Sequence, residues 1–491
     1  MLQIHSAERA DALVGTLAER LRTPLPDPFT AEIVAVPTRG IERFITQRLA
    51  HALGTRPGRE DGVCANVVFP SPGRLLFDAA ARACELEPDL DPWRADRLIW
   101  ALLETIEAAA GEPWLGPLAR HLEAQPDRRL SRARALAALF DRYASARPAL
   151  IQCWASGQED HWQARLWRAL RERVGSESPA ERLPLACERI ATEPDLLELP
   201  ERITMFGLTR LAAAPLAVLC ALAVRRDVLL LLPRACAAEG APVNPLLISW
   251  GREQRGFWQQ LSAHTGAASH LPAAVLPAAA AAAAPSLLRL LQRDIRENRA
   301  PPGAPLPGTD DRRPELDRRE RSVRIHACHG HARQVEVLRE AILHRLADDP
   351  TLEPRDVIVM CPDVEAFAPL IEASFGSGGQ GVDGDEHDES QRRDPTRALQ
   401  VRIADRSLRQ ANPLLSVIAR LLELAGGRVR ASEVLDLADT EPVRRRLRFD
   451  DDELAQIREW VAEASIHWGL DADARAPFRL EHVAAGTWAA G

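Results

Sequence analysis

Short apolar runs alternate with amphipathic helical stretches along this chain, most clearly within residues 321–376. Residues 323–328 form a short run with β-branched side chains, and residues 332–346 then place apolar side chains at helical spacing. Residues 357–361 are a second apolar run, and another helical stretch follows them. The order strand, helix, strand, helix predicts a right-handed crossover in a buried parallel sheet, and therefore an α/β fold.

The same pattern recurs elsewhere in the sequence. Further predicted strands are residues 2–5, 33–36, 65–69, 203–206, 228–232 and 401–404. A long helical region runs from residue 77 to about residue 147, where Pro148 should end it. Trp154, Trp162 and Trp167 follow closely, and we expect them to be core anchors.

Lysine is absent from the sequence, so all 62 basic residues are arginine. A P-loop needs a lysine to reach the β and γ phosphates of a nucleotide, and Schiff-base chemistry also depends on lysine. No acidic pair follows the predicted strands 203–206 and 228–232, so a carboxylate for magnesium is missing there as well. The composition therefore excludes a standard ATPase site in this chain.

The cysteines and the charge place further bounds on function. The eight cysteines are scattered and form no CxxC pair, which predicts buried thiols in a reducing, cytoplasmic compartment. We find no signal core and no apolar run long enough to span a membrane. The net charge of −8 argues against a uniformly basic surface, but a local arginine patch is compatible with phosphate binding.

The turn Pro37-Thr38-Arg39-Gly40 follows a predicted strand and leads into a helix, a geometry that cradles phosphate at a helix N-terminus. It has one glycine and no lysine, which weakens a nucleotide interpretation. Thr38, Arg39 and Arg43 are also suited to hold a nucleic-acid backbone or to contact a base edge. Ordinary surface residues after a strand are the third interpretation.

A basic stretch lies within residues 121–147, which carry six arginines in an acidic protein. It is either a solvated helix face or a surface that contacts a nucleic-acid strand. Asp141 in this stretch is able to accept a hydrogen bond from cytosine, but a salt bridge with Arg142 or Arg147 is the favoured interpretation.

The turn Cys328-His329-Gly330-His331 lies at the predicted carboxyl edge of a sheet, where open α/β folds bind ligands. A Cys–His pair would make a nucleophile or a metal site, so a stand-alone α/β enzyme is an alternative function. Two residues in one tight turn seldom align in this way. A thiol-reactivity assay and metal analysis would separate this alternative from DNA binding.

Several separate blocks resemble one family in the right order: EIVAVPTRGIERFITQRLA, ANVVFPSPGRLLFD, LFDRYASARPALIQCW, MFGLTRLAAAPLAVL and IHACHGHARQVEVL. They are similar to RecC, the gamma subunit family of exodeoxyribonuclease V. The resemblance runs along the whole chain, and family members are much longer, so an amino-terminal part is expected. The related AddB-type subunit is an alternative, and its iron–sulfur cysteines would lie beyond this sequence. The amino-acid sequences of the blocks favour RecC over this alternative.

The resemblance implies a superfamily-1 helicase architecture that has lost its ATPase motifs. It would contain two RecA-like parallel-sheet domains with a helical insertion. The implied division is 1–76 and 196–299 for the first helicase-like domain, 77–195 for its insertion, 300–320 for a linker, 321–410 for the second helicase-like domain and 411–491 for the truncated start of its insertion.

The resemblance also implies a function. Such a chain would be a non-catalytic subunit of RecBCD that guides and separates DNA strands in double-strand break repair, with a tunnel that inspects the 3′-ended strand for the hotspot Chi. Its partners would be RecB-like and RecD-like subunits in a heterotrimer, double-stranded DNA ends and single-stranded DNA. ATP and magnesium would be held by the partner subunits, with no cofactor, metal or catalytic residue in this chain.

Local matches imply which residues face that strand. They are Pro37, Arg39, Arg43, Ser71, Phe77, Leu139, Asp141, Arg147 and, on a looser match, Arg182; Thr38 joins them from the chemistry of its turn. Arg39 departs from the family pattern of amide and hydroxyl groups, and arginine favours contact with phosphate or guanine over adenine. We therefore expect strand guidance to be retained and the recognised sequence to differ.

Overall fold

The computed structural model describes most of the chain and divides it into two units. The described residues are 1–27, 29–54, 62–123, 129–236, 241–265, 270–272, 286–304, 307–308, 310–311, 313, 315, 319–375, 399, 401, 403 and 412–491. The first unit is Met1–Arg324 and the second is Ile325–Gly491. The division falls just after the predicted linker 300–320.

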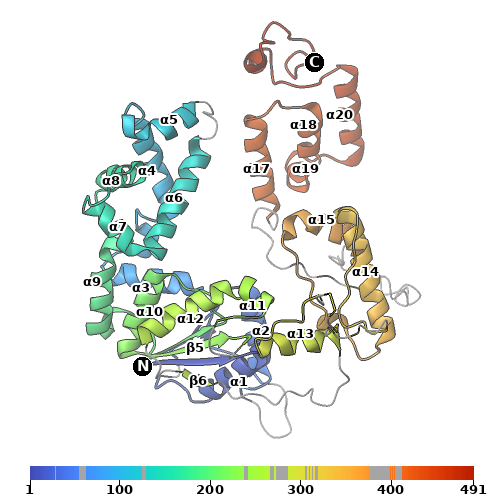
Figure 1. The fold of residues 1–491 in the computed structure, drawn as a ribbon. Coiled ribbons are helices and arrows are strands. Elements are labelled where there is room, and N and C mark those ends of the chain that lie inside the picture. Colours follow the sequence, from blue (N-terminus) through green and yellow to red (C-terminus); the bar gives the residue numbers. More distant parts are fainter. Residues whose placement is uncertain are drawn as a thin grey trace. The chain divides into compact units, whose positions relative to one another are not determined.

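The first unit is built on a parallel sheet, which confirms an α/β fold (Figure 1). Its strands within the described residues are β1 (Leu2–Ala7), β2 (Glu32–Ala35), β3 (Val67–Val68), β4 (Arg202–Phe206), β5 (Asp227–Pro233) and β6 (His270–Pro272). Their order across the sheet is β3-β2-β4-β5-β1-β6, with every pairing parallel. Each of the first five coincides with a predicted apolar run, and only the short β6 was not expected.

Alternate residues of β2 and β5 enter hydrophobic clusters on opposite faces of the sheet. Along β5, Val228 and Leu230 join one cluster, whereas Leu229 and Leu231 join the other. Burial on both faces explains why these strands read as continuous apolar runs instead of alternating with polar residues. The sheet is therefore the centre of a three-layer structure.

Helices cover both faces of the sheet. On one face lie α1 (Ala10–Leu21) and α2 (Arg39–Ala50). The other face is covered by α3 (Pro72–Ala83), α9 (Pro179–Thr192), α10 (Ala213–Arg225) and α12 (Arg252–Thr265), after the short α11 (Pro245–Ser249). Figure 1 shows α1 on the opposite side of the sheet from α10 and α12. The predicted boundary at residue 77 falls inside α3, whose apolar face packs against the sheet.

The segment between β3 and β4 adds a helical lobe with its own core. Its helices are α4 (Ala95–Ala108), α5 (Gly116–Glu123), α6 (Arg129–Ala146), α7 (Pro148–Ala155) and α8 (Trp162–Val174), and α9 joins its core to that of the sheet. Trp154 and Trp167 are each 1% exposed at the centre of this lobe, and the rings of Trp93 and Trp167 stack with centroids 5.7 Å apart. Trp162 is half-buried against them. The expectation of tryptophan core anchors is confirmed.

The second unit does not contain the expected sheet within its described residues. Helices α14 (Gly330–Asp348) and α15 (Val364–Phe375) form and pack together, but the runs 323–328 and 357–361 are not strands. Ile325, Ile358 and Met360 are 85% or more exposed. A parallel strand needs neighbouring strands and cover on both faces, and the described residues provide neither for these runs. Residues 401 and 403 are also not in a strand, and residues 402 and 404 of that predicted run lie outside the described residues.

The rest of the second unit is helical: α17 (Pro413–Ala425), α18 (Ala431–Ala438), α19 (Glu441–Leu447) and α20 (Asp451–Glu463). The loops that follow α20 pack around Arg475, which is 4% exposed. Its guanidinium donates to the carbonyl oxygens of Trp468, Val483 and Ala485. Among the helices that the structure describes, none is long and apolar enough to cross a membrane.

Candidate nucleic-acid interface

The turns after β2 and β3 meet at the carboxyl edge of the sheet. The backbone N–H of Val36 donates to the carbonyl oxygen of Pro70 at 3.0 Å, which places the Pro37-Thr38-Arg39 turn beside Ser71. The two segments were predicted as candidate sites from separate parts of the sequence, and the structure brings them together. Parallel pairing causes this, because the carboxyl ends of neighbouring strands lie at the same edge.

The hydroxyls of these turns cap the helices that follow. Thr38 Oγ1 accepts from the N–H of Ile41 at 3.3 Å, and Ser71 Oγ accepts from the N–H of Arg74 at 3.4 Å. Each hydroxyl therefore satisfies an otherwise unpaired N–H of a first helical turn. Both side chains are exposed and keep a free hydroxyl hydrogen to donate.

Arg39 and Arg43 form an exposed basic stripe on α2. They are four residues apart and therefore lie on one face of the helix. Within the described residues, no carboxylate forms an ion pair with either guanidinium. Pro37 is exposed just before this stripe, and Phe77 is half-buried on α3. Because neither arginine has a counterion among the described residues, both are suited to bind an external anion.

Helix α6 carries a second group of arginines without counterions. None of the described carboxylates forms an ion pair with the arginines of this helix, which are Arg129, Arg132, Arg134 and Arg142, or with Arg147 just after its end. On α8 and α9, in contrast, every arginine forms an ion pair; the pairs are Arg165 and Arg168 with Asp160, Arg171 with Glu181, Arg173 with Glu104, Arg182 with Asp91, and Arg189 with Glu85 and Glu193. Within the lobe, the arginines of α8 and α9 are therefore paired, whereas those of α6 have no ion-pair partner among the described carboxylates.

The expected salt bridge of Asp141 does not form. Among the described residues, its carboxylate pairs with neither Arg142 nor Arg147, although Asp141 is exposed on the surface of α6. Solvent reaches this side chain, yet the protein atoms around it desolvate the carboxylate and raise its pKa above the usual range. Leu139, predicted beside it, is half-buried.

Arg182 is held inside the protein. Its Nη2 lies 2.5 Å from Asp91 Oδ2, and the side chains are 11% and 0% exposed. A buried guanidinium that already has a carboxylate partner is not available to a strand at the surface. The structure therefore separates Arg182 from the other predicted residues.

The segment β4–α10 connects the two basic groups. α10 packs against α6, and the turn before it begins at Gly207, where a Cβ would lie 3.5 Å from Ile41 Cδ1 of α2. This turn follows the predicted strand 203–206, but its exposed Thr209 and Arg210 were not proposed as site residues. Finding them requires the strand order, because β4 neighbours β2 only after a long crossover.

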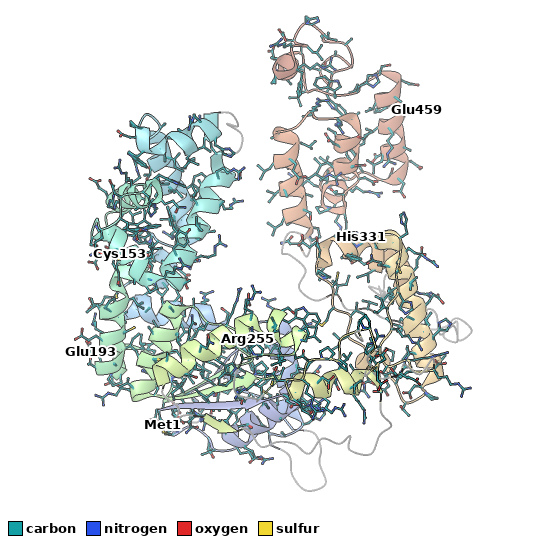
Figure 2. All side chains as sticks on the ribbon, in the orientation of Figure 1. Met1, Cys153, Glu193, Arg255, His331 and Glu459 are labelled. Carbon is teal, nitrogen blue, oxygen red and sulfur yellow. The ribbon has the colours of Figure 1, made fainter. Side chains whose placement is uncertain are left out.

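The alternative Cys–His site is not assembled. Cys328 Sγ lies 3.8 Å from the carbonyl oxygen of His326, and His331, which is labelled in Figure 2, packs on Phe367 with ring centroids 4.6 Å apart. No hydrogen bond joins the thiol to His329 or His331 in the described part of the chain. That same part contains no group of three metal-ligating side chains. The nucleophile geometry of a thiol and an adjacent base is missing.

Two family models match this sequence. The model described as "RecC, N-terminal domain" matches residues 2–298, and the model described as "RecBCD enzyme subunit RecC fourth domain" matches residues 411–491.

Curated relatives are similar over the whole chain. The RecBCD enzyme subunit RecC of Mycobacterium tuberculosis (strain CDC 1551 / Oshkosh) is 41% identical over 528 residues, covering 100% of this chain and 45% of that protein. The protein of the same name from Mycolicibacterium smegmatis is 40% identical, covering 99% and 44%. That of Escherichia coli (strain K12) is 27% identical, covering 99% and 47%. The chain thus spans less than half the length of these relatives.

Proposed function

The chain belongs to the RecC family, and on this premise we propose that it guides and separates DNA strands as a non-catalytic subunit of a RecBCD-type complex. Its partners would be RecB-like and RecD-like subunits, and its substrates double-stranded DNA ends and the single strands produced from them. The complex would act in the cytoplasm in double-strand break repair. An AddB-type subunit is set aside, because the matched family is RecC.

The observation that carries this proposal is the separation of paired from unpaired arginines. Single-stranded DNA offers one phosphate per nucleotide, and a channel for it needs cations that are not neutralised by the protein. The α2 stripe of Arg39 and Arg43 and the exposed face of α6 supply such cations in a chain of net charge −8. Phe77, half-buried on α3, is suited to stack on a base, which is worth about 1–3 kcal/mol.

We propose that the chain contributes a rigid surface and does not itself hydrolyse ATP. A sequence without lysine lacks the P-loop residue that contacts nucleotide phosphates, so ATP and magnesium belong to the motor subunits. The parallel sheet of the first unit is then a RecA-like domain that retains its shape without an ATPase site. A second RecA-like domain remains a prediction from the family resemblance alone.

A finer proposal concerns the inspection of the 3′-ended strand. Arg39 stands at a position where the family pattern has an amide or hydroxyl group, and arginine is suited to phosphate or to the O6 and N7 of guanine. The strand would therefore be inspected for a sequence other than the familiar Chi octamer. A binding selection from randomised oligonucleotides tests this, and recovery of the familiar octamer would count against it.

Co-expression with RecB-like and RecD-like subunits tests the main proposal. We expect a three-subunit complex that crosslinks to forked DNA through this chain and loses ATP hydrolysis when the P-loop lysines of both motor subunits are replaced. ATP hydrolysis by this chain alone would refute the proposal, and so would failure to co-purify with either partner.

A further inference from the structure

Strands β2 and β4 are neighbours whose following helices lead in opposite directions across the sheet. From β2 the chain passes through α2 to β3 at the edge, whereas from β4 it passes through α10 to β5 on the other side. Divergent connections leave a crevice outside the carboxyl ends of the two strands, and open α/β sheets bind ligands at such switch points. One wall of this crevice is the Pro37-Thr38-Arg39 turn already assigned to the strand.

The second wall is the turn of residues 207–212 after β4. The register pairs Ala35 with Met205, which places Pro37 level with Gly207. Gly207 has φ +73° and donates its N–H to the carbonyl oxygen of Leu231 at 2.8 Å. This left-handed conformation favours glycine and turns the chain sharply at the sheet edge. Leu208 is then 5% exposed in the core, and this anchor leaves Thr209 and Arg210 at the surface.

Arg210 is available to bind an anion. Its side chain is 77% exposed, and its Nη1 lies 3.8 Å from Oε1 of Glu253, which is itself 67% exposed. An ion pair this long between two exposed groups contributes little, so an external phosphate competes with it readily. Arg39 and Arg43 on α2 and Arg210 after β4 therefore place cations on both walls of the crevice.

We propose that Thr209 and Arg210 form the second wall of the strand-binding surface, with Arg210 binding a phosphodiester of the same single strand that Arg39 contacts. The inference rests on the proposed function, because it assumes that a strand lies along the turn after β2. Thr209 would donate its hydroxyl hydrogen to the backbone of that strand. Phosphate on a free nucleotide shares this chemistry, so the test must separate the two sources.

The test measures binding of a fluorescein-labelled oligothymidine to the full chain by anisotropy across a range of salt concentrations. The variants are Arg210→Ala, Arg39→Ala and their combination, with Arg210→Lys as a charge-retaining variant. Arg82→Ala is the matched control, because Arg82 is exposed near the end of α3, forms no ion pair with a described carboxylate and lies away from the carboxyl edge. Thermal melting confirms that each variant is folded.

We expect Arg210→Ala and Arg39→Ala each to weaken binding about 5-fold to 10-fold, with the slope of log affinity against log salt reduced by about 0.7 for each. The combination should reduce the slope by about 1.4, and Arg210→Lys should retain it. The control should bind like the wild type. Millimolar deoxyadenosine monophosphate should leave the complex intact.

The outcomes separate the two levels of the proposal. If Arg39→Ala weakens binding and Arg210→Ala does not, the second wall is refuted and the proposed function stands. If neither variant differs from the Arg82→Ala control, the contact assumed by the proposed function is itself refuted. Displacement of the oligonucleotide by the mononucleotide would identify a nucleotide site and overturn the inference.

Discussion

At the scale of single residues, whether an arginine has a carboxylate partner indicates its role. Arg182 and Asp91 are buried together, so each neutralises a charge that would otherwise be costly inside the protein. Arg39 and Arg43 have no described counterion and face solvent. The sequence places all three arginines in comparable polar contexts, and only burial and pairing distinguish them.

Removing the buried partner of Arg182 should destabilise the first unit. Asp91→Ala leaves the guanidinium buried and unpaired, which costs about 3–5 kcal/mol of unfolding free energy. Asp160→Ala removes the carboxylate of an exposed pair with Arg165 and Arg168, and should cost at most about 1 kcal/mol. Urea denaturation measures both variants. Equal losses in the two would contradict the structural role given to Arg182.

Removing both arginines of the α2 stripe should weaken strand binding in a salt-dependent way. The Arg39→Ala and Arg43→Ala double variant loses two phosphate contacts, so the slope of log affinity against log salt should fall by about 1.4. Anisotropy titrations from low to physiological salt measure the slope. Replacing Arg165, which is paired on α8, provides the control. An unchanged slope in the double variant would argue that the stripe is only a solvated face.

The thiol of Cys187 should react slowly. Burial raises its pKa to about 11, so little thiolate is present at neutral pH. Because the raised pKa favours the neutral thiol, reactivity should increase only as the pH approaches 11. At pH 8 alkylation should be slower than that of an ordinary thiol by on the order of 100-fold. Iodoacetamide labelling read by mass spectrometry tests this, and rapid labelling of Cys187 in the folded chain would contradict it.

At the scale of elements, the sequence predicts strands well where the protein completes a sheet around them. The apolar runs of β1, β2, β4 and β5 were identified within one or two residues. The runs 323–328 and 357–361 have similar composition but lie exposed in extended coil. An apolar run indicates that a segment is able to form a strand. Whether neighbouring strands are present to pair with it depends on tertiary contacts.

The candidate site was predictable to the same degree. The turns after β2 and β3 follow recognisable strands, so their residues could be proposed from the sequence. The contribution of Arg210 could not, because it depends on β4 lying beside β2. The burial of Arg182 could not be predicted either. Its partner Asp91 lies between α3 and α4, far from Arg182 in the sequence.

The unpaired arginines of α6 and the paired arginines of α8 give an element-scale prediction. Charge reversal of Arg134 and Arg142 on α6 should reduce single-strand affinity by 10-fold or more, on the order expected for two lost cations and two added anions. Charge reversal of Arg165 and Arg173 on α8 breaks ion pairs with Asp160 and Glu104 and should change affinity far less. Filter binding compares the two variants. A greater loss from the α8 variant would contradict the assignment of α6 to the strand.

At the scale of the whole molecule, an acidic chain combines a parallel-sheet unit that lacks an ATPase lysine with unpaired arginines on α2 and α6. The matched RecC relatives are more than twice as long as this chain, since it covers 44–47% of the three compared above. Strand guidance by a passive subunit requires that DNA contacts follow the carboxyl edge of the sheet and α6, and not the paired arginines of α8 and α9.

Photocrosslinking of a bromodeoxyuridine-substituted single strand, with the crosslinked peptides mapped by mass spectrometry, tests this most directly. The account predicts crosslinks in residues 37–43, 71–77, 129–147 and 207–212, which compete with unlabelled single strand. Crosslinks confined to α8 and α9, or to the amino edge of the sheet, would contradict it.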